Sequence, residues 1–271
     1  MMNRQKFYEY LRKKDSGVFG TRLSQKQVDG LENLLDVWEK YFAGDRDYGK
    51  DELAYNLGTA YWETARTMQP IMERGSRSYF NKYEPGTRIG KILGNTQAGD
   101  GYRFRGAGHV QNTGRRNAEV SSQALSRITG SRVDFVNNPD SRLDPFLSAL
   151  SLYVGNHEGW WTGKEPDDYL DGVDEDDEED FREFVNARRV VNGTDKARTI
   201  AGFAVAFDKA LDYADYGTYT VLQRNNPRSV PTPRPKPKPD NEPVRQPEPV
   251  KRNPFFEVFL WIVNLFMGNK R

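Results

Sequence analysis

Apolar side chains recur every three or four positions through most of residues 1–215, the spacing of helices that bury one face. Residues 24–42 show it most clearly, and there Ser24 stands three places before Gln27, as in a capping box. The same periodicity returns over residues 113–128, 144–157 and 181–213, the last broken at Asn192–Gly193. The pattern predicts a mainly helical domain.

A second helix is predicted over Asp51–Met68, with a buried stripe formed by Leu53, Leu57, Ala60, Tyr61 and Ala65. Glu63 lies two places from Tyr61 and therefore leaves that stripe for another face. Pro70 cannot continue the helix, so we expect a turn near Met68–Pro70. An unbroken helix would separate Glu63 from Glu73 by about 15 Å, too far for two carboxylates that share one glycosidic bond. The turn allows Glu73 to fold back toward Glu63.

Two segments between the predicted helices are expected to be irregular. Residues 74–114 are rich in Gly, Tyr and Arg and predict loops, with a small hairpin around Tyr102–Phe104. Exposed aromatic and polar side chains on such loops are common in binding sites. Residues 165–183 predict an exposed acidic loop, and their acidic run lacks the glycine and the ligand spacing of a calcium loop.

The C-terminal part of the chain changes character. We assign residues 1–224 to the folded domain, residues 225–253 to a Pro-rich extended linker and residues 254–271 to a hydrophobic tail. As a helix, the apolar run Phe255–Met267 would be about 20 Å long, against about 30 Å for a bilayer core. We expect it to form a short helix that contacts a membrane surface. Docking on the domain or self-association, and a tilted span, remain alternatives.

Composition narrows the chemistry. The 271 residues include no cysteine and two histidines, His109 and His157, which argues against thiol catalysis and metal hydrolysis. No phosphate loop, dinucleotide fingerprint or nucleophile elbow is present, so we expect no metal, cofactor or nucleic-acid partner. Residues 224–271 carry net charge +6 and residues 1–223 carry −5. The basic N-terminus has no apolar segment behind it, so we expect the protein to accumulate in the cytoplasm.

Two carboxylates and a polar run are the candidate chemistry. Glycoside hydrolysis needs one acid that protonates the leaving oxygen and one carboxylate that acts as base or nucleophile. Glu63, on a helix beside Tyr61 and Trp62, suits the acid because partial burial raises a carboxyl pKa. We expect Glu73 to stay ionised in a polar loop near arginines and water. In the run Gly99–Arg115, aromatic rings could stack on sugars, and Gln111 and Asn112 could bind hydroxyl or acetamido groups.

The runs A-Y-W-E-T-A-R-T-M-Q-P-I-M-E and G-D-G-Y-R-F-R-G-A-G-H-V-Q-N-T-G-R-R-N resemble the glycoside hydrolase family 19 chitinase-like group, and within it the phage and prophage endolysins with a lysozyme-like fold. The resemblance extends to W-W-T-G-K at residues 160–164 and F-V-N-A-R-R-V-V-N-G-T-D at residues 184–195. It implies a lysozyme-like, two-lobed helical domain with a small loop or β-hairpin region.

For this chain the resemblance implies that Glu63 is the general acid, Glu73 the second catalytic acidic residue and Thr113 the residue that holds the attacking water. The sugar groove would be lined by Tyr102, Arg105, Gln111 and Asn112. The chain departs from the family pattern with Trp62 in place of histidine, Asn112 in place of leucine and Ala118 in place of tyrosine. Trp62 leaves the orientation of Glu63 open, and Glu84 or Asp100 could take the second role instead of Glu73.

The sequence therefore predicts a monomeric peptidoglycan hydrolase that cuts the β-1,4 bond between N-acetylmuramic acid and N-acetylglucosamine, with inversion, to lyse a host cell. Its partner would be the glycan strands of the cell wall, reached after release from the cytoplasm. The alternatives are a chitinase, a non-catalytic glycan-binding or virion protein, and a carrier for a membrane-active tail.

Overall fold

The computed structural model describes residues 2–45, 48–173 and 177–216, so the predicted linker and tail lie outside the described residues. The chain is mainly helical, as predicted. The longer helices are α1 Arg4–Leu11, α2 Gln25–Tyr41, α3 Lys50–Glu63, α6 Arg115–Thr129, α7 Pro145–His157, α8 Asp177–Ala187 and α9 Ala197–Tyr213. The shorter elements are α4 Arg88–Ile92, α5 Asp100–Arg103, the 3-10 helices η1 Arg77–Tyr83, η2 Pro139–Leu143, η3 Pro166–Asp168 and η4 Arg188–Val190, and the strands β1 Ile71–Met72 and β2 Ala107–Gly108.

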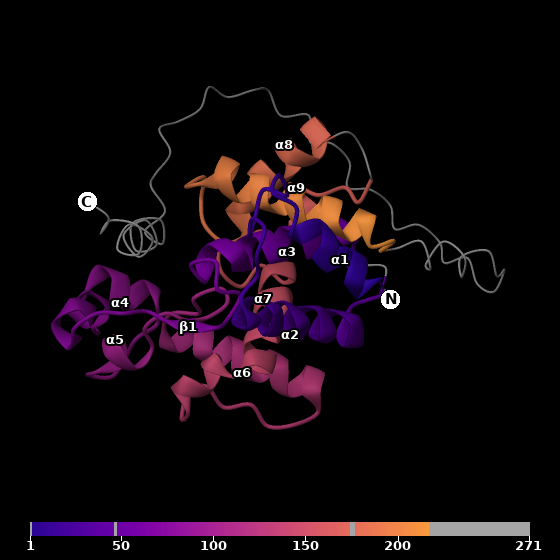
Figure 1. The fold of residues 1–271 in the computed structure, drawn as a ribbon. Coiled ribbons are helices and arrows are strands. Elements are labelled where there is room, and N and C mark those ends of the chain that lie inside the picture. Colours follow the sequence, from indigo (N-terminus) through magenta and orange to yellow (C-terminus); the bar gives the residue numbers. More distant parts are fainter. Residues whose placement is uncertain (1, 46–47, 174–176, 217–271) are drawn as a thin grey trace, which may run out of the picture.

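Helix α3 is the centre of the molecule. All of its 14 residues except Lys50 and Trp62 are buried. It packs along α9 on one side and against α7 on another, and Figure 1 shows it enclosed by the other long helices. At its crossing with α9, a Cβ atom on Gly58 would stand 2.7 Å from the backbone nitrogen of Ala204. Glycine therefore lets the two backbones approach this closely.

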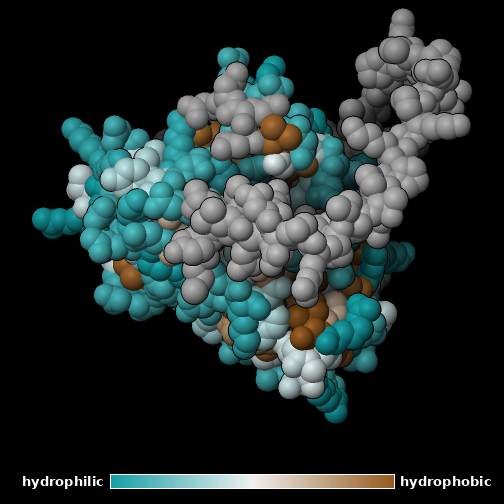
Figure 2. Space-filling view, turned by 90° about the vertical axis from the view of Figure 1, so that its right-hand side faces the viewer, coloured by the Kyte–Doolittle hydropathy of each residue, from teal (hydrophilic) through white to brown (hydrophobic). Residues whose placement is uncertain are grey.

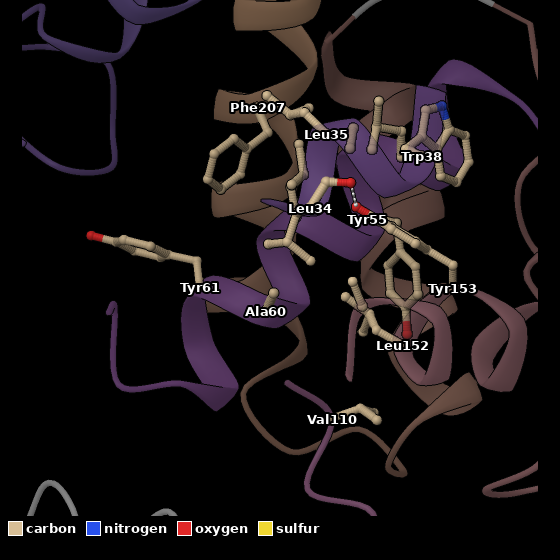
Figure 3. Close-up of a cluster of buried hydrophobic side chains, with 14 of the residues drawn as sticks. Leu34, Leu35, Trp38, Tyr55, Ala60, Tyr61, Val110, Leu152, Tyr153 and Phe207 are labelled. Carbon is tan, nitrogen blue, oxygen red and sulfur yellow. Dashed lines mark hydrogen bonds between the residues drawn. The ribbon is translucent and has the colours of Figure 1, made fainter. Parts of the chain in front are cut away.

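The main core joins α2, α3, α7 and α9. Figure 3 shows Trp38 of α2, Tyr61 of α3 and Phe207 of α9 among its side chains. The Tyr153 hydroxyl of α7 donates a hydrogen bond of 3.0 Å to the carbonyl oxygen of Leu34, so this buried polar atom is satisfied. One continuous core thus fixes the position of the C-terminal end of α3.

Helix α2 begins as its sequence predicts. The Ser24 hydroxyl accepts a hydrogen bond from the backbone nitrogen of Gln27, and the Gln27 side chain accepts one from the backbone nitrogen of Ser24. This reciprocal capping box satisfies two backbone donors that the first turn leaves without helical partners. The predicted helix over residues 24–42 is confirmed to within a residue at each end.

Helix α3 ends at Glu63, five residues before the predicted end at Met68. The Thr64 hydroxyl donates to the carbonyl oxygen of Ala60 at 2.7 Å and accepts from the backbone nitrogen of Met68 at 3.0 Å, which closes a tight turn. Ala65, Arg66 and Met68 have positive φ values of 51°, 68° and 58° in this turn. Ala65 is exposed there, so its place in the predicted buried stripe was wrong.

The two strands form one small antiparallel sheet, with Ile71 opposite Gly108 and Met72 opposite Ala107. The hairpin expected around Tyr102–Phe104 was wrong, because Tyr102 lies in helix α5 and Phe104 is its C-cap. The strand pairing instead joins segments that lie more than 30 residues apart. It places Glu73, which follows β1, beside the chain that leads into β2.

A second, smaller core lies apart from the first. Phe80, Tyr83 and Leu93 form it, and they come from η1 and the end of α4. Figure 1 shows α4 and α5 at one end of the molecule, away from the long helices. The molecule therefore has a large helical body and a small lobe, and the sheet lies between them.

The acidic segment is only partly a loop. Residues 177–183 lie in the first two turns of α8, where a loop was predicted. Acidic side chains near a helix N-terminus are stabilised by the helix dipole, which the charge count alone does not register. The other predicted helices are confirmed as α6 and α7, and α8 and α9 are separated around Asn192–Gly193.

The surface of the described residues is mostly hydrophilic on the face that Figure 2 shows, with small separate hydrophobic patches. Among the described residues, no helix combines the length and the apolar character that crossing a membrane requires.

Candidate active site

Glu63 ends helix α3 inside the protein. Its residue is 6% exposed, and Arg188 Nη1 donates to Glu63 Oε1 at 3.0 Å. Burial raises the pKa of the Glu63 carboxyl to about 7, although the charge and the hydrogen bond of Arg188 oppose this shift. A carboxyl group with this pKa is half protonated near neutral pH and can donate a proton there. The ring of Trp62 stacks on Phe203 of α9, and Arg188 fixes the orientation of Glu63.

Arg188 begins the short helix η4 and is fully buried. Its Nε atom donates to the carbonyl oxygen of Asp195 at 3.3 Å. The Thr162 hydroxyl lies 2.8 Å from the carbonyl oxygens of Arg189 and Val190, so it secures the same short helix. The sequence runs at residues 160–164 and 184–195 therefore cooperate to hold a guanidinium group against Glu63.

Glu73 follows strand β1 and is 3% exposed. Its Oε2 atom accepts from the backbone nitrogen of Gly106 at 3.0 Å, and its Oε1 atom accepts from the Tyr83 hydroxyl at 3.1 Å. The expectation that Glu73 lies in a water-rich loop was wrong, because its carboxyl group is buried and accepts hydrogen bonds from Gly106 and Tyr83. Burial raises the pKa of Glu73, while the Gly106 N–H donor opposes that rise most strongly.

Aromatic rings and one lysine complete the surroundings of Glu73. Lys82 Nζ lies 3.6 Å from the ring centroid of Tyr79 and 4.7 Å from that of Tyr83. Burial lowers the pKa of Lys82 to about 8, and the negative charge of Glu73 opposes that shift. Glu73 thus sits among phenol groups and a half-buried cation, whereas Glu63 sits against a buried guanidinium.

Glu73, Gln111 and Thr113 meet around Gly106. A Cβ atom on Gly106 would stand 2.7 Å from Gln111 Oε1, 3.2 Å from Thr113 Oγ1 and 3.3 Å from Glu73 Oε2. Gln111 has a positive φ of 52°, and its Nε2 atom donates to the carbonyl oxygens of Ile71 and Gly108 at 3.0 Å. The Thr113 hydroxyl donates to the carbonyl oxygen of Gln111, so its lone pairs can still accept. Three oxygen atoms therefore converge on one point of the backbone.

A cleft of about 630 Å³ adjoins these groups. Glu73, Tyr102 and Arg105 line it, and so do Thr64 and Ala65, the two residues that follow Glu63. The cleft brings together residues from the end of α3, the strand β1 and the α5 segment. These are the segments that carry most of the predicted site.

Asn112 does not join this group. Its residue is 2% exposed, and its Nδ2 atom donates to Ser121 Oγ of α6 at 2.9 Å. Arg142 Nη1 donates to its carbonyl oxygen at 2.6 Å. The structure therefore gives Asn112 a role in holding β2 to α6, away from the groove that it was expected to line.

Glu84 and Asp100, the other candidates for the second carboxylate, hold backbone and side chains in place. Glu84 accepts from the backbone nitrogens of Gly99 and Gly101 at the start of α5. Asp100 receives two hydrogen bonds from Arg115, at 2.6 and 2.8 Å. Burial acts to raise the pKa of Asp100, but Arg115 and two backbone donors outweigh it and lower that pKa.

Both histidines have partners inside the fold. His109 Nδ1 lies 2.7 Å from Ser148 Oγ and its Nε2 lies 3.2 Å from the carbonyl oxygen of Met68. Burial lowers the pKa of His109 to about 4, so the ring is neutral at pH 7. His157 Nδ1 lies 3.3 Å from Glu52 Oε2. Within the described ranges, no group of three or more His, Asp and Glu side chains is placed to hold a metal ion.

Comparison with known proteins adds no relative. No family model matches the chain, and no curated protein or solved structure is significantly similar to it. The family resemblance in the sequence motifs therefore stays a prediction.

Sequence reasoning missed Arg188, Tyr83 and Gly106. Arg188 and Glu63 are 125 residues apart, and no local pattern shows that they meet. Arg188 lies in the run at residues 184–195 that carries part of the family resemblance, and this was the one sequence feature that could have marked it as a site residue. Tyr83 looked like one of several loop aromatics, and its contact with Glu73 requires the fold of η1.

Proposed function

We propose that the chain is a glycosidase with a lysozyme-like arrangement that hydrolyses the glycan strands of peptidoglycan. The observation that carries this proposal is a pair of buried carboxylic acids: Glu73, which lines the cleft and accepts hydrogen bonds from Tyr83 and Gly106, and Glu63, whose pKa is about 7 and which directly precedes the cleft-lining residues Thr64 and Ala65. Glycoside hydrolysis is a reaction that uses two carboxyl groups with different protonation states. The resemblance of the motifs to endolysins supports the same substrate.

In this proposal Glu63 is the general acid. Its proton passes to the glycosidic oxygen as the bond from that oxygen to the anomeric carbon breaks. Glu73 is the general base, which takes a proton from a water molecule as the water oxygen bonds to the anomeric carbon. Thr113 can hold that water, because its own proton is already donated to the Gln111 carbonyl oxygen. We propose inversion at the anomeric carbon, in keeping with a water-mediated displacement.

The cleavage site is proposed to be the β-1,4 bond between N-acetylmuramic acid and N-acetylglucosamine, and the biological role to be lysis of a host cell by a phage or prophage. The endolysin-like motifs support the role. A chitinase would use the same two carboxyl groups on a neutral polymer. The arginines beside the cleft favour peptidoglycan, which carries carboxylates, over neutral chitin.

The test of the catalytic assignment is Glu63→Gln, which keeps the acceptor for Arg188 and removes the proton. We expect at least a hundred-fold lower rate of release of reducing ends from purified cell walls, because general acid catalysis contributes about 10²–10⁴-fold. Glu158→Gln, an exposed carboxylate on the end of α7, is the matched control and should act at the wild-type rate. A folded Glu63→Gln protein with a near wild-type rate would overturn the assignment.

A further inference from the structure

Arginines gather beside the candidate catalytic carboxylates. Arg74 and Arg105 line the cleft with Glu73, and Arg77, Arg103 and Arg105 line an adjoining hollow of about 490 Å³. The two hollows share Tyr102 and Arg105, so they are neighbours. None of these four arginines forms an ion pair with any residue in the described part of the chain.

The Tyr102 ring holds two of these guanidinium groups. The Cζ atom of Arg105 lies 4.1 Å from the ring centroid and that of Arg77 lies 4.7 Å from it. Arg105 Nη1 also donates to the carbonyl oxygen of Tyr102 at 2.7 Å. Cation–π contacts fix the position of a guanidinium group but leave its charge unneutralised and its other N–H donors available. Tyr102 therefore acts as a support for cations, and its ring is less available for stacking on a sugar.

The acidic groups nearby offset this charge only in part. Asp100 is committed to Arg115, and Glu73 is buried against Tyr83 and Gly106. Asp140 is the other carboxylate that lines the hollow. Burial, followed by repulsion from Arg105, lowers the pKa of the buried Arg142 behind the site. Neighbouring guanidinium groups repel one another, and an anion that binds between them replaces this repulsion with attraction.

We propose that Arg77 and Arg105 form a subsite for the free carboxylates of the peptide stems that peptidoglycan carries, next to the position of bond cleavage. Guanidinium groups bind carboxylates through paired hydrogen bonds, and neutral chitin has no such group to offer. This inference depends on the proposed function and names the part of the substrate that sets its specificity. The cleft would thus select an anionic glycopeptide over a neutral glycan.

The test measures binding, so that it does not depend on catalysis. Glu63→Gln protein is titrated onto insoluble cell-wall sacculi stripped of covalently attached phosphate polymers, which leaves carboxylates as the anions. Arg77→Gln and Arg105→Gln are added singly and together, and Arg127→Gln, an exposed arginine on α6, is the matched control. The same titrations are repeated on sacculi whose carboxylates have been amidated, and with chitin oligomers.

We expect the double variant to bind native sacculi at least ten-fold more weakly than the Arg127→Gln control. On amidated sacculi and on chitin oligomers, the double variant and the control should bind with the same affinity. Arg77 is exposed and forms no ion pair among the described residues, so its single variant should fold normally and lose binding by itself. Binding of native sacculi within two-fold of the control, or equal losses on native and amidated sacculi, would overturn the subsite. Failure of wild-type protein to release reducing ends would instead overturn the proposed function and leave these binding results interpretable.

Discussion

At the scale of single residues, burial of Glu63 and its opposing contact with Arg188 together set the pH range in which the proposed acid is protonated. Burial raises the Glu63 pKa to about 7, and Arg188 holds it lower than burial alone would. A general acid works in its protonated form, so activity should fall as pH rises through this value. The alkaline side of the pH profile therefore reports directly on Glu63.

Replacement of Arg188 should move that profile. In Arg188→Gln the opposing positive charge is lost, the Glu63 pKa rises further, and the alkaline limb of kcat/KM shifts upward by on the order of one pH unit. The measurement is kcat/KM on cell walls from pH 5 to 10. Arg189→Gln makes the same change of charge one residue away and should leave the limb in place. A limb that stays put or moves down in Arg188→Gln would contradict the assignment of Glu63 as the acid.

Single residues also show what sequence reasoning could reach. Glu63 and Glu73 could be proposed from the motifs, and partial burial of Glu63 was expected from its neighbours Tyr61 and Trp62, although its position lies off the predicted buried stripe of the helix. Burial of Glu73 did not follow, because it depends on Tyr83 and Gly106, which arrive from other segments. Tertiary contacts determine the environment of a side chain. The arginines next to Glu73 in the sequence suggested a solvated carboxylate, whereas the fold buries it.

At the scale of elements, local signals identified most of the longer helices, but they missed α1 and misplaced the end of α3. The Ser24 and Gln27 capping box fixed the start of α2 within the sequence itself. The end of α3 was predicted at Met68, just before the helix breaker Pro70, while the chain turns earlier through the Thr64 hydroxyl. Helix α1 was not predicted. Its buried face, formed by Phe7, Tyr8 and Leu11, is explained by packing against α9, a contact that the local sequence does not show.

The crossing of α3 and α9 gives a paired prediction about stability. Gly58→Ala would place a methyl group 2.7 Å from the backbone of Ala204, and we expect a loss of about 1–3 kcal/mol in the free energy of unfolding. Gly202→Ala, on α9, meets open space and should stabilise the protein by about 1 kcal/mol through helix propensity. Urea unfolding of both variants measures this. Equal effects of the two substitutions would contradict the close packing.

At the scale of the whole molecule, the sequence predicted a mainly helical fold, and the structure agrees, whereas the small sheet pairs other segments than the predicted hairpin. The separate small core around Phe80, Tyr83 and Leu93 was not foreseen, because its residues were expected to lie in loops. Arrangement of the two cores on either side of the sheet depends on the pairing of Ile71 with Gly108, a long-range contact that periodicity cannot show.

Stability as a function of pH should report on the buried carboxyl group of Asp208 in α9. Lys50 Nζ lies 3.2 Å from Asp208 Oδ1, yet burial outweighs this contact and raises the Asp208 pKa to about 7. An acid whose pKa is higher in the folded state contributes stability that is complete below its unfolded pKa, near 4, and is lost as pH rises through 7. Lys50 stays charged across this window and does not alter the sign.

In Asp208→Asn the side chain is permanently neutral, so the variant should match wild type at pH 4 and exceed its Tm at pH 8 by on the order of 5 °C. Thermal unfolding followed by circular dichroism at the two pH values measures this. Asp15→Asn replaces an exposed aspartate and is the control: its Tm difference from wild type should be the same at pH 4 and pH 8. A difference in Tm between Asp208→Asn and wild type that is no larger at pH 8 than at pH 4 would contradict the burial of an ionisable carboxyl group at this position.

The proposed activity itself is tested most directly by mass spectrometry of the soluble fragments that the full-length protein releases from purified peptidoglycan. We predict fragments with N-acetylmuramic acid at the reducing end, produced by wild type and lost in Glu63→Gln. Fragments that end in N-acetylglucosamine would show that another bond is cut. Absence of any released glycan fragments from folded wild-type protein would contradict the assignment of Glu63 and Glu73 as a glycosidase pair.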